Sequence, residues 1–234
     1  MTKTAVITGA SQGLGRALAE GLARDGWQLV IDARTGPDLE RAAADLSRLT
    51  KVTAIAGDVV DDDHRAELAA AADRLGGADL LVNNASTLGG SPPPPLATFP
   101  LPALLDTFEV NVLAPIALTQ LLLPQLRRST AGAVLNVSSD AAVEAYEGWG
   151  GYGAAKAALD HASAVLAKEE PTVRVWAVDP GDLRTRLQQE AFPGEDISDR
   201  PLPETAVPPL LDLLRRRPPS GRYRASDLLA TVGA

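Results

Sequence analysis

Three side chains in the second half of the chain have the types and spacing for proton transfer to a carbonyl oxygen. Tyr152 and Lys156 stand four residues apart in YGAAK, and Ser139 lies thirteen residues before Tyr152. Four residues is about one helical turn, so phenol and ammonium lie on one helix face. A nearby cation favours phenolate and moves a tyrosine toward acid/base use near neutral pH. A YxxxK pair is common, and on its own a solvated lysine beside a half-buried tyrosine is the better explanation.

Apolar runs of strand length alternate with helical patterns along the chain. Strands are expected at 4–8, 28–32, 52–56, 80–83, 133–138 and 173–178, with a short last strand near 221–224. Helices are expected near 14–25, 38–49, 62–75, 101–128 and 151–169. This alternation predicts a parallel sheet covered on both faces, with right-handed crossovers. The expected fold class is α/β: a doubly wound, three-layer Rossmann-like fold with a mostly parallel six- to seven-stranded sheet.

Composition narrows the class of function. A chain of 234 residues without a flexible linker is expected to form a single domain, 1–234. Its net charge of -8 argues against a nucleic-acid partner. The absence of cysteine excludes disulfides, thiolate metal ligands and cysteine nucleophiles. The N-terminus shows no signal peptide, and the uncharged run 110–126 is too short and too polar for a membrane span, so a cytoplasmic protein without a membrane partner is expected.

A glycine-rich turn follows the first expected strand and opens the first helix. It reads TGASQGLG over residues 8–15, with the spacing G-x-x-x-G-x-G. Small residues let the backbone approach a pyrophosphate, and a helix N-terminus supplies free N–H groups and positive potential. The position of this turn in a βαβ unit predicts a dinucleotide-binding site.

Six segments together resemble the short-chain dehydrogenase/reductase family in order and spacing. They are TGASQGLG, NNAS at 83–86, Asn111 in EVNVLAP, Ser139, YGAAK at 152–156 and PGDLRT at 180–185. The match extends over nearly the whole chain. The resemblance implies one Rossmann-like NAD(P)-binding domain with seven parallel strands, a nicotinamide cofactor, and a homodimer or homotetramer.

The resemblance also implies a catalytic set: Asn111, Ser139, Tyr152 and Lys156. Tyr152 would exchange a proton with the substrate oxygen, and Ser139 would hold that oxygen. Lys156 would lower the pKa of Tyr152 and bind the nicotinamide ribose, while Asn111 would hold a water in a proton relay. Ser139 is chosen over Ser138 because only Ser139 has the thirteen-residue spacing, and strand alternation puts the two serines on opposite faces.

Most of the cofactor-binding positions that the resemblance implies lie in the glycine-rich turn and at later strand ends. They are Gly9, Ser11, Gln12, Gly13, Leu14, Gly15, Arg34, Asp58, Val59, Asn84, Ala85, Tyr152, Lys156, Pro180, Gly181 and Thr185. Asn83 would steady the central sheet, and Asp58 could also be a helix N-cap. The chain departs from the family at Ser86, which replaces a glycine; this change is expected to affect the loop slightly and the chemistry little.

The end of the second strand bears on the choice of cofactor. A carboxylate there selects the ribose 2′-hydroxyl of NAD, whereas an arginine accepts the 2′-phosphate of NADP. Both Asp32 and Arg34 are present. Counting from Gly26, the acidic position of NAD-preferring relatives falls on Ala33 and the basic position of NADP-preferring ones on Arg34, while Asp32 points to the other side of the strand. Gln12 lacks the second basic group of many NADP enzymes. On balance NADP is favoured over NAD.

Other functions fit the sequence less well. A Ser-His-Asp hydrolase would need a G-x-S-x-G elbow, which is absent. His64, in DDDHR, is expected at a solvated helix start, and His161 lies around the helix from Tyr152. Two separated histidines without cysteine do not favour a metal site. A dinucleotide-binding sensor or regulator on the same fold is the main alternative, although such proteins usually lose part of the Ser-Tyr-Lys set.

The substrate is expected to be a small or medium carbonyl or alcohol compound. A substrate lid is expected near 182–204, a segment of mixed charge with several prolines. Pro92–Pro95 is either a stiff surface spacer or part of the site rim. Trp149 is either an aromatic wall of the pocket or packing under the lid, and Tyr146 is expected at the surface or rim.

Overall fold

A seven-stranded parallel sheet forms the centre of the molecule. The computed structural model describes residues 2–230. The strands are β1 (Thr4–Ile7), β2 (Gln28–Ala33), β3 (Val52–Ala56), β4 (Leu80–Asn83), β5 (Ala133–Val137), β6 (Arg174–Asp179) and β7 (Gly221–Arg224). Their order in the sheet is β3-β2-β1-β4-β5-β6-β7. All seven strands expected from the sequence are present, and the doubly wound α/β fold class is confirmed.

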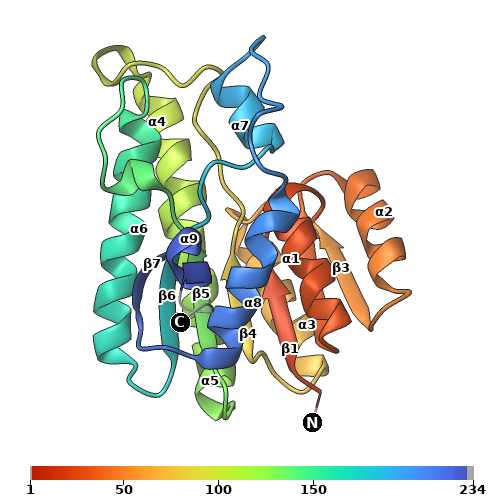
Figure 1. Ribbon diagram of the computed structural model, residues 1–234. Coiled ribbons are helices and arrows are strands. Elements are labelled where there is room, and N and C mark those ends of the chain that lie inside the picture. The colour runs from red at the N-terminus through yellow and green to blue at the C-terminus, as the bar shows by residue number, and fades with distance from the viewer. Residues whose placement is uncertain (1, 231–234) are drawn as a thin grey trace.

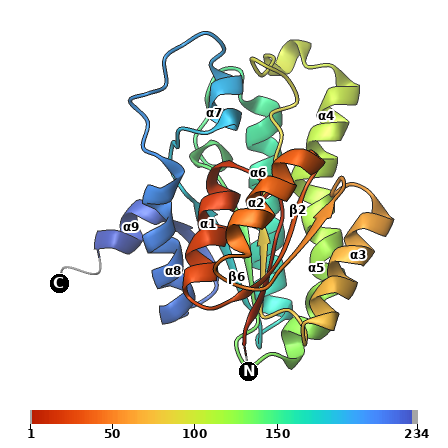
Figure 2. The ribbon, with the colours of Figure 1, turned by 90° about the vertical axis from the view of Figure 1, so that its right-hand side faces the viewer.

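Helices cover both faces of the sheet (Figures 1 and 2). One layer contains α1 (Gly13–Arg24), α2 (Gly36–Leu46), α8 (Val207–Arg216) and α9 (Ala225–Ala230), and the other contains α3 (Asp62–Arg74), α5 (Ala114–Arg128) and α6 (Gly150–Glu169). Two shorter helices, α4 (Leu101–Phe108) and α7 (Arg186–Ala191), stand beyond the carboxyl ends of the strands (Figure 1). Each face of the sheet has its own apolar core.

Two C-terminal helices, α8 and α9, do not appear among the expected elements. The first turn of α8 contains Pro208 and Pro209, which break a helical pattern when it is judged from sequence. Proline is tolerated in the first turn because the N–H groups there have no partner inside the helix. Leu210 and Leu213 of α8 are then buried against the α1 side of the sheet.

The expected long helix 101–128 is continuous but changes its winding. It consists of α4, a π-helical turn at Glu109–Leu113 and α5. The run Leu101–Arg128 has 28 residues and a mean hydropathy of 1.4, so by length and composition it could cross a membrane. This run is longer than the uncharged segment 110–126, on which the expectation of no membrane span was based. Leu118, Leu122 and Leu126 are buried in the core on the α3 side of the sheet, whereas other leucines of the run, such as Leu101 and Leu105, are exposed.

Buried amide groups tie the middle strands together behind the carboxyl edge. Asn83 of β4 donates its Nδ2 to Asn136 Oδ1 of β5 at 2.7 Å. Asn136 in turn donates to Ser163 Oγ of α6 at 2.7 Å. Both asparagines are 4% exposed, and buried polar groups of this kind are costly unless paired. Asn83 therefore fixes β4 against β5, as the sequence predicts.

Candidate active site

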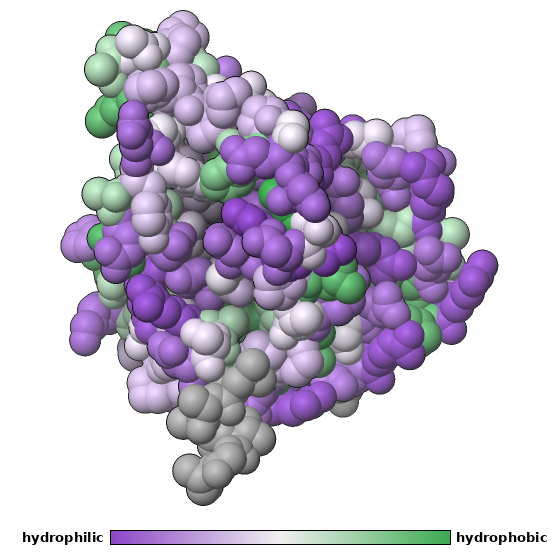
Figure 3. Space-filling model, turned by 45° about the horizontal axis from the view of Figure 1, so that its top comes forward, coloured by the Kyte–Doolittle hydropathy of each residue, from purple (hydrophilic) through white to green (hydrophobic). Residues whose placement is uncertain are grey.

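A cleft of about 610 Å³ runs along the carboxyl edge of the sheet. In a parallel sheet all strands end at the same edge, so loops from distant parts of the sequence meet there. The cleft extends from the end of β2 to the start of α6 and passes under α7. Figure 3 shows mainly hydrophilic side chains around this region, with hydrophobic ones gathered at the upper left, on the side of α4 and α6.

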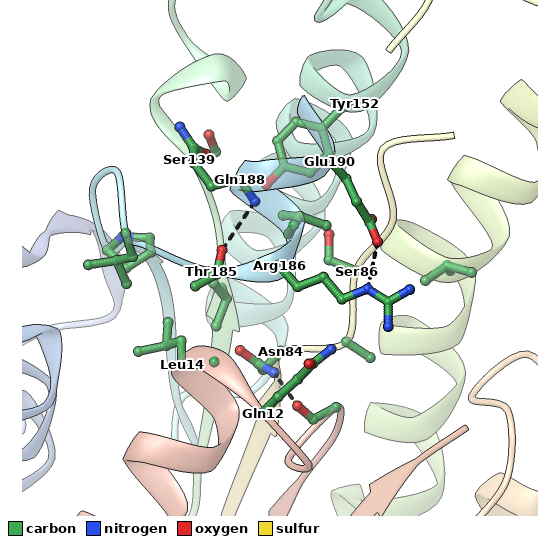
Figure 4. A pocket seen from close by; sticks show the side chains of 18 of the residues that line it. Gln12, Leu14, Asn84, Ser86, Ser139, Tyr152, Thr185, Arg186, Gln188 and Glu190 are labelled. Carbon is green, nitrogen blue, oxygen red and sulfur yellow. Dashed lines mark hydrogen bonds and ion pairs between the residues drawn. The ribbon is translucent and has the colours of Figure 1, made fainter. Parts of the chain in front are cut away.

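Every position predicted to be catalytic or to bind cofactor lines this cleft, except Asn111 and Gly15, which lie behind its wall. The lining includes Gly9, Ser11, Gln12, Gly13, Leu14, Arg34, Asp58, Val59, Asn84, Ala85, Ser139, Tyr152, Lys156, Pro180, Gly181 and Thr185. Figure 4 shows Gln12, Leu14 and Asn84 on one side and Ser139 and Tyr152 on the other, with Thr185 between them. The structure thus brings together residues that are far apart in the chain, from the glycine-rich turn near its start to Tyr152 in its second half.

The glycine-rich turn leaves an open cradle at the start of α1. Gly9 and Gly13 have φ of 66° and 58°, a conformation that favours glycine. A Cβ on Gly15 would lie 2.4 Å from Asn84 Nδ2, so the turn cannot accept a side chain there. Gln12 at the N-cap gives no side-chain cap, which leaves the first N–H groups of α1 facing the cleft. Such a cradle fits the pyrophosphate of a dinucleotide.

Hydrogen bonds hold the glycine-rich turn against the end of β4. The Asn84 amide donates to the carbonyls of Thr8 at 2.8 Å and Gly9 at 3.1 Å. Thr8 Oγ1 accepts from the backbone N–H groups of Asn84 and Ala85, both at 3.0 Å. These bonds bridge the position where the strand order changes direction between β1 and β4, which is where ligands bind in open α/β sheets.

Tyr152 and Lys156 lie in the first two turns of α6 and are almost fully buried. Tyr152 is 5% exposed and Lys156 is 2% exposed. The Lys156 ammonium donates to the Val137 carbonyl at 2.7 Å and lies 5.5 Å from the centre of the Tyr152 ring. Close packing makes this possible, because Gly153 sits against the Ala141 carbonyl with no room for a Cβ. The shared helix face and the nearby Ser139 agree with the sequence prediction.

Burial dominates the proton affinities of this pair. It raises the pKa of Tyr152, and hydrogen bonds with the hydroxyls of Ser139 and Ser86 oppose that rise. Burial also lowers the pKa of Lys156 to about 8, against a smaller opposing effect of Asp160. The net change in the pKa of Tyr152 is upward, opposite to the lowering that the sequence predicted from Lys156, because desolvation is the largest effect and the Lys156 ammonium is directed at the Val137 carbonyl. Tyr152 therefore keeps its proton at neutral pH.

Ser86 is a site residue that the sequence argument underestimated. Its hydroxyl donates to Asn111 Oδ1 at 2.7 Å and lies beside the Tyr152 phenol, where it opposes the rise in the pKa of that group. Asn111 is fully buried in the π-helical turn, and its amide donates to the Thr87 carbonyl at 2.8 Å. A hydroxyl in place of the family's glycine thus connects Asn111 with the phenol. The signal in the sequence that could have shown this role was the replacement of a glycine by the polar Ser86 at a position that lines the cleft.

Arg34 and Asp58 mark the opposite end of the cleft. Arg34, directly after β2, is exposed, and within residues 2–230 it has no ion pair or side-chain hydrogen bond. Asp58 accepts a hydrogen bond from Val60 N at 3.2 Å, and the N-cap of α3 is Asp61, which accepts from Asp63 and His64. The alternative role of Asp58 as N-cap is therefore wrong, and its carboxylate faces the cleft.

His64 is not solvated, contrary to the sequence expectation. It is 6% exposed, and its Nε2 lies 3.0 Å from Oδ2 of Asp32, which is 1% exposed. Asp32 Oδ1 accepts a hydrogen bond from Gly9 N at 2.7 Å. The run of acids before His64 indicated an exposed helix start, but it could not show that the ring turns inward. His161 is exposed and does not line the cleft, as expected.

The expected lid contains α7 and closes against the glycine-rich turn. Thr185 caps α7 by accepting from Gln188 N at 3.2 Å, and its γ-methyl would lie 3.5 Å from a Cβ on Gly13. Arg186 and Glu190, four residues apart in α7, form an ion pair at 2.8 Å (Figure 4), and both line the cleft. Ser91 Oγ donates to the Glu190 carbonyl at 2.8 Å, so the proline loop braces the lid, while Pro92–Pro95 themselves do not line the cleft.

An aromatic wall closes the substrate end. Trp149 packs edge-on against Tyr152, with ring centres 5.6 Å apart, and against Phe192 of the lid at 6.2 Å. Both roles considered for Trp149, pocket wall and packing under the lid, are therefore met. Asp140 accepts hydrogen bonds from Ser139 Oγ at 3.0 Å and from the Tyr146 hydroxyl at 2.9 Å. Among the described residues there is no cluster of acids and histidines suited to a metal ion.

Curated relatives share this chain's sequence over most of its length. A model of the short chain dehydrogenase family matches residues 3–196. An uncharacterized oxidoreductase of Mycobacterium tuberculosis is 36% identical over 83% of this chain and 74% of its own. Serine 3-dehydrogenase of Agrobacterium fabrum is 36% identical over 80% of this chain and 74% of its own. Sepiapterin reductase of Mus musculus is 36% identical over 80% of this chain and 76% of its own.

Solved structures of short-chain dehydrogenases have the same architecture. One from Pseudomonas syringae aligns with a TM-score of 0.89 and 29% identity, over 95% of this chain and 94% of its own. One from Shigella flexneri, complexed with NADP, aligns with a TM-score of 0.87 and 29% identity, over 96% and 97%. The fold and the order of site-forming loops in this chain are therefore those of proteins that bind nicotinamide dinucleotides.

Replacing the buried lysine tests the strength of its desolvation. We expect Lys156→Met to raise the free energy of unfolding at pH 7 by about 2 kcal/mol, since it removes a buried charge but also the bond to Val137. The pKa of Lys156 is about 8 in the folded protein and near 10.5 ordinarily. Between these two pH values the folded protein has lost the proton that the unfolded chain still binds, so the free energy of unfolding of the wild type rises with pH. The stability advantage of the variant shrinks over the same range. Urea unfolding at pH 7 and pH 10 measures both.

The exposed Lys168, in the last turn of the same helix, supplies the control. Lys168→Met should leave the free energy of unfolding unchanged at both pH values. A Lys156→Met protein that is less stable than wild type at pH 7, or equally favoured at pH 7 and pH 10, would contradict the assignment.

Proposed function

The chain belongs to the short-chain dehydrogenase/reductase family of oxidoreductases, and we propose that it transfers a hydride reversibly between NADP(H) and a carbonyl or secondary alcohol substrate, with Tyr152 as general acid/base. The observation that carries the proposal is the buried Tyr152 phenol. It faces the cleft between the hydroxyls of Ser139 and Ser86, with Lys156 beside it.

The cleft offers a suitable place for each part of a dinucleotide. The side-chain-free turn and the open N-terminus of α1 fit the pyrophosphate. Arg34 and Asp58 would hold the adenosine end, and Asn84, Lys156 and the segment Pro180–Thr185 the nicotinamide end. When bound, the nicotinamide supplies or accepts the hydride.

The protein's own residues handle the proton. The raised pKa of Tyr152 keeps the phenol protonated, so it can donate a proton to the oxygen of a carbonyl during reduction. Ser139 holds that oxygen beside the phenol, and Ser86 and Asn111 continue the hydrogen-bond chain away from the substrate. A charged Lys156 favours the phenolate that is left after the transfer. Substrate oxidation reverses the proton's direction.

Tyr152→Phe should lower the turnover number by about 1000-fold, because the ring keeps its packing while the acid is lost. Binding of NADPH, measured by the change in its fluorescence, should stay within about threefold of wild type. Turnover is followed through the nicotinamide absorbance with a panel of ketones, aldehydes and diketones. Substantial activity in Tyr152→Phe would exclude the mechanism, and wild-type binding without turnover on any compound would favour the sensor alternative.

Two features support NADP over NAD. Arg34 is exposed at the end of β2 and free to meet a 2′-phosphate, whereas both carboxylate oxygens of Asp32 are engaged, by Gly9 N and by His64. As strand alternation predicts, Asp32 points to the α3 side, opposite Ala33. The neighbours from Shigella flexneri and Escherichia coli were solved with NADP and NADPH, which is consistent with this choice.

Arg34→Ala should raise the Michaelis constant for NADPH by about tenfold or more and change that for NADH much less, since a charge-assisted bond to phosphate is lost. Steady-state kinetics with both cofactors measures the two constants. Arg48→Ala, which removes an exposed arginine just beyond α2, is the control and should change neither. Equal losses with both cofactors would overturn the assignment.

The substrate is proposed to be a small or medium carbonyl or alcohol compound. The cleft end near Tyr152 combines the aromatic pair Trp149 and Phe192 with the polar groups of Asp140 and Tyr146. Relatives of equal identity are named for different substrates, serine and sepiapterin, so identity to them does not select one.

We further propose a cytoplasmic homodimer or homotetramer that joins through α4 and α5. Four leucines of this helical run have large exposed fractions: Leu101, Leu105, Leu113 and Leu121 are 71%, 67%, 58% and 43% exposed. Exposed apolar surface of this kind can mark an interface, and a second copy would present the same leucines.

Leu105→Glu should convert the oligomer to a monomer, because the interface would bury an unpaired charge. Sedimentation velocity measures the change. Leu49→Glu is the matched control: Leu49 lies just beyond α2, is 42% exposed, and its substitution should leave the assembly intact. A monomeric wild-type protein would refute the proposal.

A further inference from the structure

Asp32 and His64 form a buried, titratable pair that the proposed reaction does not use. Asp32 comes from β2 and His64 from the first turn of α3. Asp32 Oδ2 lies 3.0 Å from His64 Nε2, and Asp32 Oδ1 accepts the Gly9 N–H at 2.7 Å. The pair is therefore fixed directly under the glycine-rich turn, at the Arg34 end of the cleft.

The structure makes specific room for this histidine. A Cβ on Gly57 would lie 2.2 Å from His64 Nδ1, so the ring occupies space that only a glycine leaves open. Asp61 fixes the start of α3 by accepting from Asp63 N at 2.8 Å and His64 N at 3.4 Å. The inward position of the ring is thus set by its neighbours.

We propose that His64 is a cofactor-specificity residue, which keeps the buried Asp32 carboxylate electrically neutralised so that the same end of the cleft can accept the 2′-phosphate of NADP beside Arg34. This inference rests on the proposed use of NADP. His64 acts through Asp32 and is a positioning residue: it holds the Asp32 side chain away from the ribose and sets the charge beneath it.

The charge argument concerns one proton shared by the pair. With that proton, on either partner, Asp32 and His64 together carry no net charge; without it they carry one negative charge. Burial raises the pKa of Asp32, and the bond with Asp32 raises the pKa of His64, so both effects favour retention of the shared proton. Loss of the proton at higher pH would place a buried negative charge close to a dianionic phosphate.

Other charged groups around the pair act in the same sense. Asp58 faces Asp32, and Asp61 and Glu67 of the α3 segment face His64. All three are acids, so each favours retention of the proton. On the cleft side Arg34 is the cation of this end. Deprotonation of the pair is therefore the event that changes the local charge above neutral pH.

The test is the ratio of two affinities as a function of pH. Binding of adenosine 2′,5′-bisphosphate and of adenosine 5′-monophosphate to the full chain is measured by calorimetry between pH 7 and pH 9.5, where the 2′-phosphate is already dianionic. The ratio removes effects common to both ligands, such as folding or the titration of Lys156. In wild type we expect the preference for the bisphosphate to fall about tenfold as the pair loses its proton.

Two variants separate this role from a structural one. Asp32→Asn has no carboxylate that can become negatively charged, so the preference of this variant for the bisphosphate should not change with pH. His64→Gln keeps a hydrogen-bond donor near Asp32, but the proton can then reside only on Asp32, which loses it more readily. The fall in the preference for the bisphosphate should therefore occur at lower pH. His161→Gln, the same substitution at an exposed histidine, should behave as wild type.

A wild-type preference that is constant over this range overturns the inference, as does a fall that persists in Asp32→Asn. If Asp32→Asn does not fold, the His64→Gln curve decides, because an unmoved transition would contradict the role of His64. Failure of the NADP assignment is recognised separately, as a protein that binds NADH more tightly than NADPH at every pH. The pH dependence of the fragment ratio remains decisive for the pair in that case.

Discussion

The hydrogen bonds between the ends of β1 and β4 are the constraint on which the site depends. The Asn84 amide and Thr8 Oγ1 lock the glycine-rich turn to the loop that continues into Ser86. This contact is closer than any side chain on Gly15 would allow. The close contact between the turn and Asn84 therefore requires a glycine at position 15. A bound phosphate would need a residue without a side chain in the same turn, so protein packing and phosphate binding both favour glycine there.

The same close packing sets the chemistry of Tyr152 and Lys156. Both groups are more than nine-tenths buried, and desolvation favours the neutral form of each. A protonated phenol is the form that gives a proton to a carbonyl oxygen, which is what the proposed reduction requires of Tyr152. A bound cationic nicotinamide ring would act in the opposite direction on the phenol, which suits the reverse reaction.

The sequence predicted the parts of the structure that follow from local pattern and left out those that depend on long-range contact. Strand periodicity and the position of the glycine-rich turn located all seven strands and most of the predicted positions that line the cleft. Helix α8 was missed because Pro208 and Pro209 suggest a break, although they fit a first turn. The burial of His64 depends on Asp32, 32 residues earlier in the chain, and on the space at Gly57. Acidic neighbours in the sequence pointed the other way.

Hydrogen bonds and the backbone together connect the two ends of the cleft through Gly9. Gly9 gives its N–H to Asp32, and its carbonyl accepts from Asn84. Two residues further on, Ser86 donates to Asn111 beside the Tyr152 phenol. Such a path transmits a signal only if its members have two arrangements. Here the members are strand ends and a glycine-rich turn held by backbone bonds, so the path keeps Asp32 and Tyr152 at a fixed separation. Cofactor choice at one end and proton transfer at the other can then be set by separate residues, with the glycine-rich turn as their common frame.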